Sequence, residues 1–293
     1  MTDPDPASAT RADRLIDGGL RAALGVALAL RYERRVPAFG TLIARAAGPL
    51  SGFRRRALAQ LALAFPDLEE ADRRRIARAS LDNLGRTLAE IYSGTEFAER
   101  IAGADCLGGP GLDTVLAARA AGRPVVLVSA HFGNHLTTAT AFAAAGHPPA
   151  MLYRPLSNPL SEQHWSAALK VLSAPLFGRD RRGLAAMSRH VRDGGFLAIA
   201  ADQHVAGAPR LELFDLPART ALSPAALALK HGGLLVPAFA VRQADGLSHR
   251  VEIQAPIPAG APEAMMQDYN ERLEAIVRRH PGQWLWPHRR WKA

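Results

Sequence analysis

The stretch PVVLVSAHFGNHL, residues 124–136, joins a short apolar run to a polar turn. The run is mostly β-branched and predicts a strand buried in a sheet. Gly133 and Asn134 predict the turn that leaves this strand. His131, held just beyond a buried strand, is a candidate catalytic base because a positioned imidazole can accept a proton from a substrate. His135, one helical turn on, would make a metal-binding pair with it, but the stretch offers no third ligand.

Around this stretch, strand and helix patterns alternate along the second half of the chain. Short apolar runs predict strands, and amphipathic or alanine-rich segments between them predict helices. The alternation predicts an α/β fold with a mostly parallel or mixed central sheet flanked by helices. The strands are expected at 124–130, 150–153, 196–201, 234–241 and 250–254, and the helices at 112–121, 131–145, 162–172, 182–192 and 225–229.

The first part of the chain has a different pattern. Residues 1–13 are rich in Pro, Asp, Ser and Thr and predict a disordered tail. Residues 14–107 carry helical patterns, and the Gly-Gly-Pro-Gly run at 108–111 marks a break. We therefore expect a single domain over 14–293, made of a helical N-terminal part and an α/β core over 108–293.

The first apolar stretch, Ala22 to Leu30, bears on membrane association. Its nine residues are far fewer than the roughly 20 that a membrane-spanning helix needs. A helix lying in the membrane interface and an ordinary buried helix both remain possible interpretations. The opening residues, MTDPDP, lack the basic start and long apolar core of a secretory signal.

Composition narrows the class of partner. The chain has 293 residues, 48% of them hydrophobic, which is enough for a sizeable core. It carries a net charge of +9, and residues 121–293 hold 19 basic against 12 acidic residues. This balance suits anionic head groups or an acidic carrier protein, and no recognised nucleic-acid-binding motif appears. Cys106 is the single cysteine, so no intramolecular disulfide can form, which favours a reducing compartment.

Several segments, taken in order, carry a family resemblance. The turn at His131 is similar to the His-Phe-Gly-Asn-aromatic-Glu motif of the bacterial lipid A secondary (lauroyl/myristoyl) acyltransferases, within the wider lysophospholipid acyltransferase superfamily. Six more segments resemble that family and keep its order over about residues 54–292. They are AFPDL at 64–68, NLGRTLAE at 83–90, YRPLSNP at 153–159, DQ at 202–203, LFDLPART at 213–220, and the closing segment from Asn270 to Trp291.

The resemblance implies an activity and a setting. It implies an acyltransferase that moves a fatty acyl chain from acyl carrier protein to a hydroxyl of a lipid A precursor or related glycolipid. It places that enzyme at the cytoplasmic face of the cell inner membrane, as a peripheral or monotopic protein. It further implies a phosphorylated glycolipid acceptor, contact with the membrane surface, and no metal, bound cofactor or nucleic acid. His131 would be the general base.

One position departs from the family pattern. The acid expected five residues after His131 is replaced by Leu136. Three explanations are open: a carboxylate from elsewhere, Asp202 or Glu90, supports the histidine; a backbone carbonyl orients it and the enzyme is slow; or the protein binds lipid or acyl carrier without transfer. We expect residual or rerouted catalysis, with Asp202 as a substitute acid or a structural cap. Hydrolysis of acyl thioesters is a further alternative.

The remaining candidate site residues are polar groups near predicted strand ends or in the tail. Asn134 is expected to position the turn and contact substrate, and Gln203 lies at the carboxyl end of a strand, where ligands of open α/β sheets gather. Arg154 could hold an acceptor phosphate through paired hydrogen bonds. Arg289 and Arg290 could contact a phosphate or the carrier. The tryptophans beside them suit either a membrane interface or a closed cation–π cluster.

Overall fold

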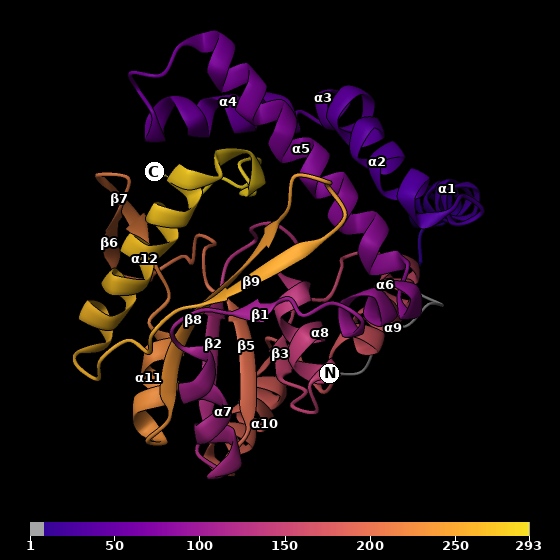
Figure 1. The fold of residues 1–293 in the computed structure, drawn as a ribbon. Helices are drawn as coiled ribbons and strands as arrows, with labels where there is room; N and C mark the ends of the chain where they lie inside the picture. The colour runs from indigo at the N-terminus through magenta and orange to yellow at the C-terminus, as the bar shows by residue number, and fades with distance from the viewer. Residues whose placement is uncertain (1–8, 293) are drawn as a thin grey trace.

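The structure is a computed structural model that describes residues 9–292. Within these residues the main sheet has seven strands in the order β1-β9-β8-β2-β5-β3-β4 (Figure 1). Neighbours run parallel except β8 and β9, which are antiparallel. The predicted class, a mostly parallel sheet flanked by helices, is confirmed. The strands are β1 (Leu107–Gly108), β2 (Val125–Ser129), β3 (Ala150–Leu152), β4 (Leu176–Phe177), β5 (Phe196–Ala200), β6 (Arg210–Leu213), β7 (Leu216–Arg219), β8 (Leu234–Arg242) and β9 (His249–Ile253).

The five predicted strands correspond to β2, β3, β5, β8 and β9. Four strands were not predicted. β1 and β4 contain two residues each, which is too short for a pattern of side-chain alternation to show. β6 and β7 form a separate antiparallel hairpin, and half of its residues are polar or proline, so it lacks an apolar run.

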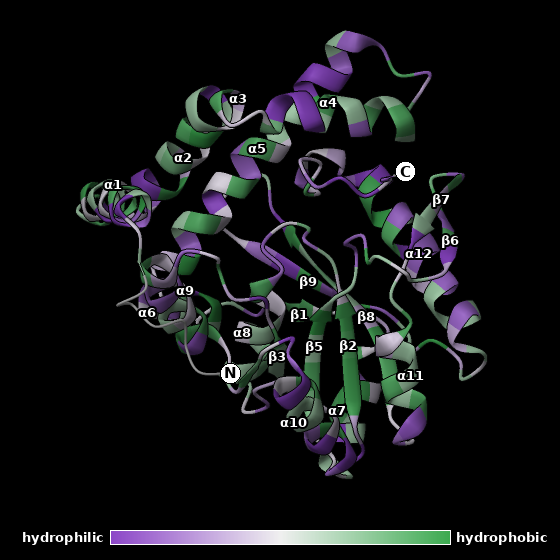
Figure 2. Cartoon of the chain, turned by 180° about the vertical axis from the view of Figure 1, so that it is seen from behind, coloured by the Kyte–Doolittle hydropathy of each residue, from purple (hydrophilic) through white to green (hydrophobic). Residues whose placement is uncertain are grey.

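The central strands are buried on both faces, as expected for a parallel sheet covered by helices. Val126 and Val128 pack in a cluster with residues of α4, α10, α11 and α12, whereas Val125 and Leu127 pack with residues of α7, α8 and α9. Figure 2 shows β2 and β5 hydrophobic along their length. The helices are α1 (Arg11–Leu28), α2 (Tyr32–Leu42), α3 (Gly48–Leu50), α4 (Phe53–Ala64), α5 (Glu70–Tyr92), α6 (Thr95–Ala102), α7 (Leu112–Ala120), α8 (Leu136–Ala144), α9 (Pro159–Leu172), α10 (Arg181–Arg192), α11 (Ser223–Lys230) and α12 (Pro262–Arg279), with a π-helical turn at Ile43–Ala47 and a 3-10 turn at Pro281–Gln283.

The N-terminal helices arch over one side of the α/β core, with α5 as the longest of them (Figure 1). Most of the predicted tail lies outside the described residues, but α1 already begins at Arg11. It starts there because Thr10 and Asp13 form a reciprocal capping box. No helix between residues 9 and 292 combines the length and apolar character needed to cross a bilayer.

The stretch from Ala22 to Leu30 is apolar on both sides of its helix. Leu24 is buried, while Val26 is 72% exposed. Earlier in α1, Leu15 and Ile16 are also exposed, and Leu50 at the end of α3 is 89% exposed. The N-terminal helices therefore contribute to the core and also present large apolar side chains to the outside.

The tryptophans of the C-terminal segment, residues 281–291, close the core. Trp284 and Trp286 are 3% and 0% exposed. They pack with Trp291 and with Phe214, whose ring stacks on Trp284 at a centroid distance of 6.0 Å. The contacts of these tryptophans are with other aromatic rings, so the cluster is internal, as in the second of the two expected roles, but aromatic rings take the place of the expected cations.

Candidate active site

His131 and Asp202 meet because their strands are parallel neighbours. β2 and β5 pair in register with Ser129 opposite Ala200, and each of the two residues lies two positions beyond that pair. The His131 Nδ1 atom is 2.8 Å from Asp202 Oδ1. The other carboxylate oxygen accepts a hydrogen bond of 2.9 Å from Trp284 Nε1. The carboxylate thus connects the histidine to the C-terminal segment.

The surroundings of this pair favour its charged form. Asp202 is only 4% exposed, whereas His131 keeps 27% of its side chain exposed. Burial works against the charge on Asp202, but His131 and the hydrogen bond from Trp284 outweigh it, so the pKa of the carboxyl lies well below its usual range. Burial likewise opposes protonation of His131, yet the Asp202 carboxylate raises its pKa overall.

This geometry defines which nitrogen of His131 can do chemistry. A carboxylate accepts hydrogen bonds, so its contact with Nδ1 assigns a proton to that atom, and in the neutral form of His131 the lone pair is then on Nε2. Gln203 lies beside that second nitrogen, with its Nε2 3.5 Å from His131 Nε2. The site therefore presents a basic nitrogen and a neighbouring amide at the carboxyl end of the central strands.

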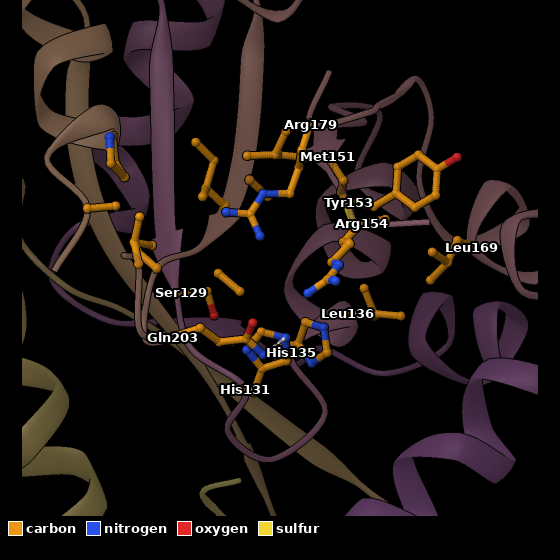
Figure 3. A pocket seen from close by; sticks show the side chains of 18 of the residues that line it. Ser129, His131, His135, Leu136, Met151, Tyr153, Arg154, Leu169, Arg179 and Gln203 are labelled. Atoms are coloured by element: carbon orange, nitrogen blue, oxygen red, sulfur yellow. Dashed lines mark hydrogen bonds between the residues drawn. The ribbon is translucent and has the colours of Figure 1, made fainter. Parts of the chain in front are cut away.

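A cavity of about 580 Å³ opens onto His131 and Gln203. Figure 3 shows the two histidines at one end and Arg154 and Arg179 reaching into it from another side. Apolar walls and a few polar groups are typical of sites for amphipathic ligands. The apolar walls include Leu136, Met151, Leu152, Trp165, Leu169, Ala198 and Ile199.

His135 lies next to His131 in this cavity, with ring centroids 4.8 Å apart. Burial and the neighbouring His131 lower the pKa of His135 to about 3, so it is neutral. The metal-ligand alternative finds no support in residues 9–292, which contain no cluster of three or more His, Cys, Asp or Glu side chains able to hold an ion.

The turn that carries His131 is hydrogen-bonded, through Asn134, to a buried ion pair. Glu90 on α5 is 0% exposed and pairs with Arg242 on β8 through both oxygens, one contact being 2.7 Å. The Asn134 amide donates to Glu90 at 2.9 Å, and its oxygen accepts the Leu136 backbone N–H at 3.1 Å. Asn134 is fully buried, so it positions the turn, and the predicted contact with substrate is not available to it. Glu90 is likewise committed to Arg242 and does not serve as the acid for His131.

Two more α5 side chains grip the same turn. Asn83 Nδ2 and Thr87 Oγ1 donate to the Gly133 carbonyl oxygen at 2.9 and 3.0 Å. Gly133 has a φ of +54°, and a Cβ atom added there would lie 1.8 Å from the Ala240 carbonyl oxygen. Glycine is therefore required, because the turn passes directly against β8.

Leu136 occupies the position where the family motif has an acid. It begins α8, is 4% exposed and lines the cavity. The carboxylate that contacts His131 comes instead from Asp202, two residues beyond the end of β5.

The arginines expected to contact substrate have different surroundings. Arg154 is exposed and lines the cavity. Arg289 is exposed on a second hollow of about 470 Å³, together with Arg56 and Lys292. Arg290 is 1% exposed, and its guanidinium donates to the Arg219 carbonyl oxygen and to a threonine hydroxyl. The expected contact of Arg290 with an anion is therefore wrong for this buried side chain, whose hydrogen bonds instead join the C-terminal segment to the end of β7.

Three residues of the site were not singled out from the sequence. Trp284 was seen only as part of an aromatic tail, although its indole N–H holds Asp202. Arg242 ends a strand and carries no motif, yet it neutralises Glu90. Arg179 reaches the cavity from the end of β4, a strand that was not predicted.

Comparison with known proteins places this site in a family. The chain is 27% identical over 242 residues to the lipid A biosynthesis lauroyltransferase of Escherichia coli (strain K12), covering 80% of this chain and 77% of that protein. The match between residues 16–293 and the bacterial lipid A biosynthesis acyltransferase family covers the cavity, the His131–Asp202 pair and the C-terminal segment, and the chain belongs to that family.

Proposed function

We propose that this protein transfers a fatty acyl chain from acyl carrier protein to a hydroxyl of a phosphorylated lipid A precursor or related glycolipid. The family and the name of the relative indicate an acyltransferase of lipid A biosynthesis. The observation that carries the proposal is the hydrogen-bonded His131–Asp202 pair, whose histidine lines a cavity with apolar walls and a few charged and polar groups. Asp202 supplies the carboxylate that the local motif, with Leu136 in place of the acid, lacks.

In the proposed reaction, His131 Nε2 accepts the proton of the acceptor hydroxyl while its oxygen attacks the thioester carbonyl carbon. The C–O bond forms, the C–S bond breaks, and the proton passes from the imidazolium to the leaving thiolate. Asp202 stabilises the imidazolium and keeps the proton on Nδ1. General-base assistance of this kind contributes roughly 10²- to 10⁴-fold to the rate.

Different parts of the protein suit the acyl chain, the acceptor phosphate and the carrier. The apolar walls, among them Leu136, Trp165 and Leu169, suit the acyl chain. Arg154 in the cavity suits the phosphate of the acceptor. Arg289, on the separate basic hollow, suits an acidic carrier protein.

We place the protein at the cytoplasmic face of the inner membrane, as its family and proposed acceptor imply. Large apolar side chains exposed on the N-terminal helices support contact with a lipid surface. Leu15, Ile16, Val26 and Leu50 are 77%, 62%, 72% and 89% exposed.

The competing function is binding of lipid or carrier without transfer. Transfer of labelled acyl chains from acyl carrier protein to lipid A precursors and to total inner-membrane glycolipids distinguishes the two. We expect transfer by the wild type, loss of at least 10²-fold in His131→Ala, and normal transfer in His147→Ala, which alters a histidine outside the cavity. Binding of either substrate with no transfer to any acceptor would establish the competing function. Release of free fatty acid without an acceptor would indicate a hydrolase.

A further inference from the structure

Two arginines enter the cavity from equivalent positions on neighbouring strands. β3 and β4 are parallel, with Leu152 opposite Phe177. Arg154 and Arg179 each lie two residues beyond this pair, at the carboxyl ends of their strands. Both line the cavity, and Figure 3 shows both guanidiniums directed into it.

Both arginines are exposed to solvent, and their like charges repel each other when no anion lies between them. Within residues 9–292, the structure records no hydrogen bond, ion pair or aromatic contact for either guanidinium. The nearest acid in sequence, Asp180, caps α10 by accepting the Gly183 N–H at 2.7 Å. Glu162, on α9 beside the cavity, accepts the Leu156 N–H at 2.6 Å.

From this juxtaposition we propose that Arg154 and Arg179 together form a phosphoryl-binding subsite in the acyl-transfer cavity, with Arg179 as its unassigned half. Two planar guanidiniums present paired donors that match phosphate oxygens. The carboxyl ends of parallel strands are also where ligands bind in open α/β sheets. The inference rests on the proposed function for the identity of the substrate, and on the cavity alone for the chemistry of the ligand.

A phosphoryl group at this site has two possible sources. It belongs either to the phosphorylated glycolipid acceptor or to the phosphopantetheine arm of the acyl carrier. The two sources share their chemistry and are separated by kinetics with matched acceptors.

The first experiment measures binding of inorganic phosphate by isothermal titration in a phosphate-free buffer. We expect Arg179→Ala and Arg154→Ala each to weaken binding roughly 10- to 100-fold, the equivalent of losing a charged hydrogen-bonding pair. Arg182→Ala removes the same charge from an exposed position on α10 outside the cavity and should leave binding unchanged. Equal affinities for Arg179→Ala and Arg182→Ala, or no binding to the wild type, would overturn the proposal.

Thermal unfolding separates a ligand-binding role from a structural one. Without phosphate, Arg179→Ala should unfold at the wild-type temperature or above, because it relieves repulsion between like charges. Added phosphate should raise the unfolding temperature of the wild type more than that of the variant. A variant that is less stable without phosphate and gains as much from phosphate as the wild type would assign Arg179 to the fold instead.

The second experiment compares kcat/KM for an acceptor glycolipid with and without its phosphate. A loss in Arg179→Ala that is confined to the phosphorylated acceptor identifies the acceptor as the source. An equal loss for both acceptors, with a raised KM for the acyl carrier, identifies the donor. Unchanged kinetics with both acceptors would refute a role for the subsite in transfer. Phosphate binding through Arg179 without any acyl transfer would support the subsite and refute the proposed function.

Discussion

Replacing Asp202 by Asn tests the site most directly, because it alters one charge and almost no volume. In the structure, Asp202 joins His131 to Trp284 through two hydrogen bonds of 2.8 and 2.9 Å. An asparagine can keep one carbonyl acceptor, but its amide group would donate to His131 Nδ1. That reverses the tautomer and puts the proton on Nε2, the atom that must accept one.

The size of the effect follows from these contacts. Loss of one charge-assisted hydrogen bond costs about 1.5–3 kcal/mol, or roughly 10- to 150-fold in rate. The wrong tautomer adds to this, and the corresponding change in the Ser-His-Asp example lowers kcat about 10⁴-fold. We therefore expect Asp202→Asn to reduce kcat by about 10²- to 10⁴-fold.

The pH profile gives a second, independent readout. His131 must be unprotonated to act, and the Asp202 carboxylate raises its pKa above the ordinary value of 6.5. Wild-type activity should therefore fall as the pH drops through a value above 6.5. In Asp202→Asn the carboxylate is gone while burial still disfavours the imidazolium, so the acidic limb should move to lower pH.

The assay is the pH dependence of acyl transfer at saturating substrate, with Asp105→Asn as the control at an exposed position. A variant with wild-type kcat and an unmoved acidic limb would refute the reasoning, since it would show that Asp202 does not act on His131. A lower kcat with an unmoved limb would indicate only a loss of structure.

Three further substitutions test the frame around the site. Gly133→Ala should destabilise the protein by roughly 1–2 kcal/mol for its positive φ and by roughly 1–3 kcal/mol more for the clash with β8. Gly146→Ala, with a φ of +84° and open space around it, should show only the first cost in urea unfolding. Glu90→Gln should lower the free energy of unfolding by about 3–5 kcal/mol, because it leaves a buried arginine without its ion-pair partner. Glu70→Gln breaks an exposed ion pair and should lower the free energy of unfolding by about 1 kcal/mol or less. Equal losses in the two variants would contradict the role given to Glu90 in supporting the turn. Leu136→Glu restores the acid of the family motif. Because His131 already has a carboxylate partner, kcat should not rise, and because the new glutamate is buried, the melting temperature should fall. A higher kcat would show that Asp202 alone does not support His131 fully.

The sequence predicted the parts of the fold that depend on local pattern. The strands β2, β5 and β8 were predicted because each lies in a run of mostly apolar residues. Two-residue strands were missed, since their position depends on the neighbouring strand. Because β4 was not predicted, its register with β3 could not be inferred either. That register is what places Arg179 and Arg154 at equivalent positions on neighbouring strands.

The candidate site was predicted in its residues but less well in their roles. His131 and Asp202 both follow apolar strands, so their meeting at one sheet edge was open to inference, whereas strand order was not. Asn134 and Arg290 are polar residues in motifs and were expected to contact a substrate, a phosphate or the carrier, but both are buried among partners from distant segments. Burial of this kind arises from tertiary packing, which local sequence does not encode.

The C-terminal segment has a consequence for when this protein becomes competent during its synthesis. Trp284 holds Asp202, the Leu285 N–H donates to the His131 carbonyl oxygen at 3.0 Å, and the Gln283 carbonyl accepts the Gly133 N–H. Translation delivers β2 and β5 well before these residues leave the ribosome. A nascent or prematurely terminated chain therefore contains His131 and Asp202 but lacks residues 283–285, whose hydrogen bonds orient them. The hydrogen bonds around the His131–Asp202 pair can therefore be completed only late in translation.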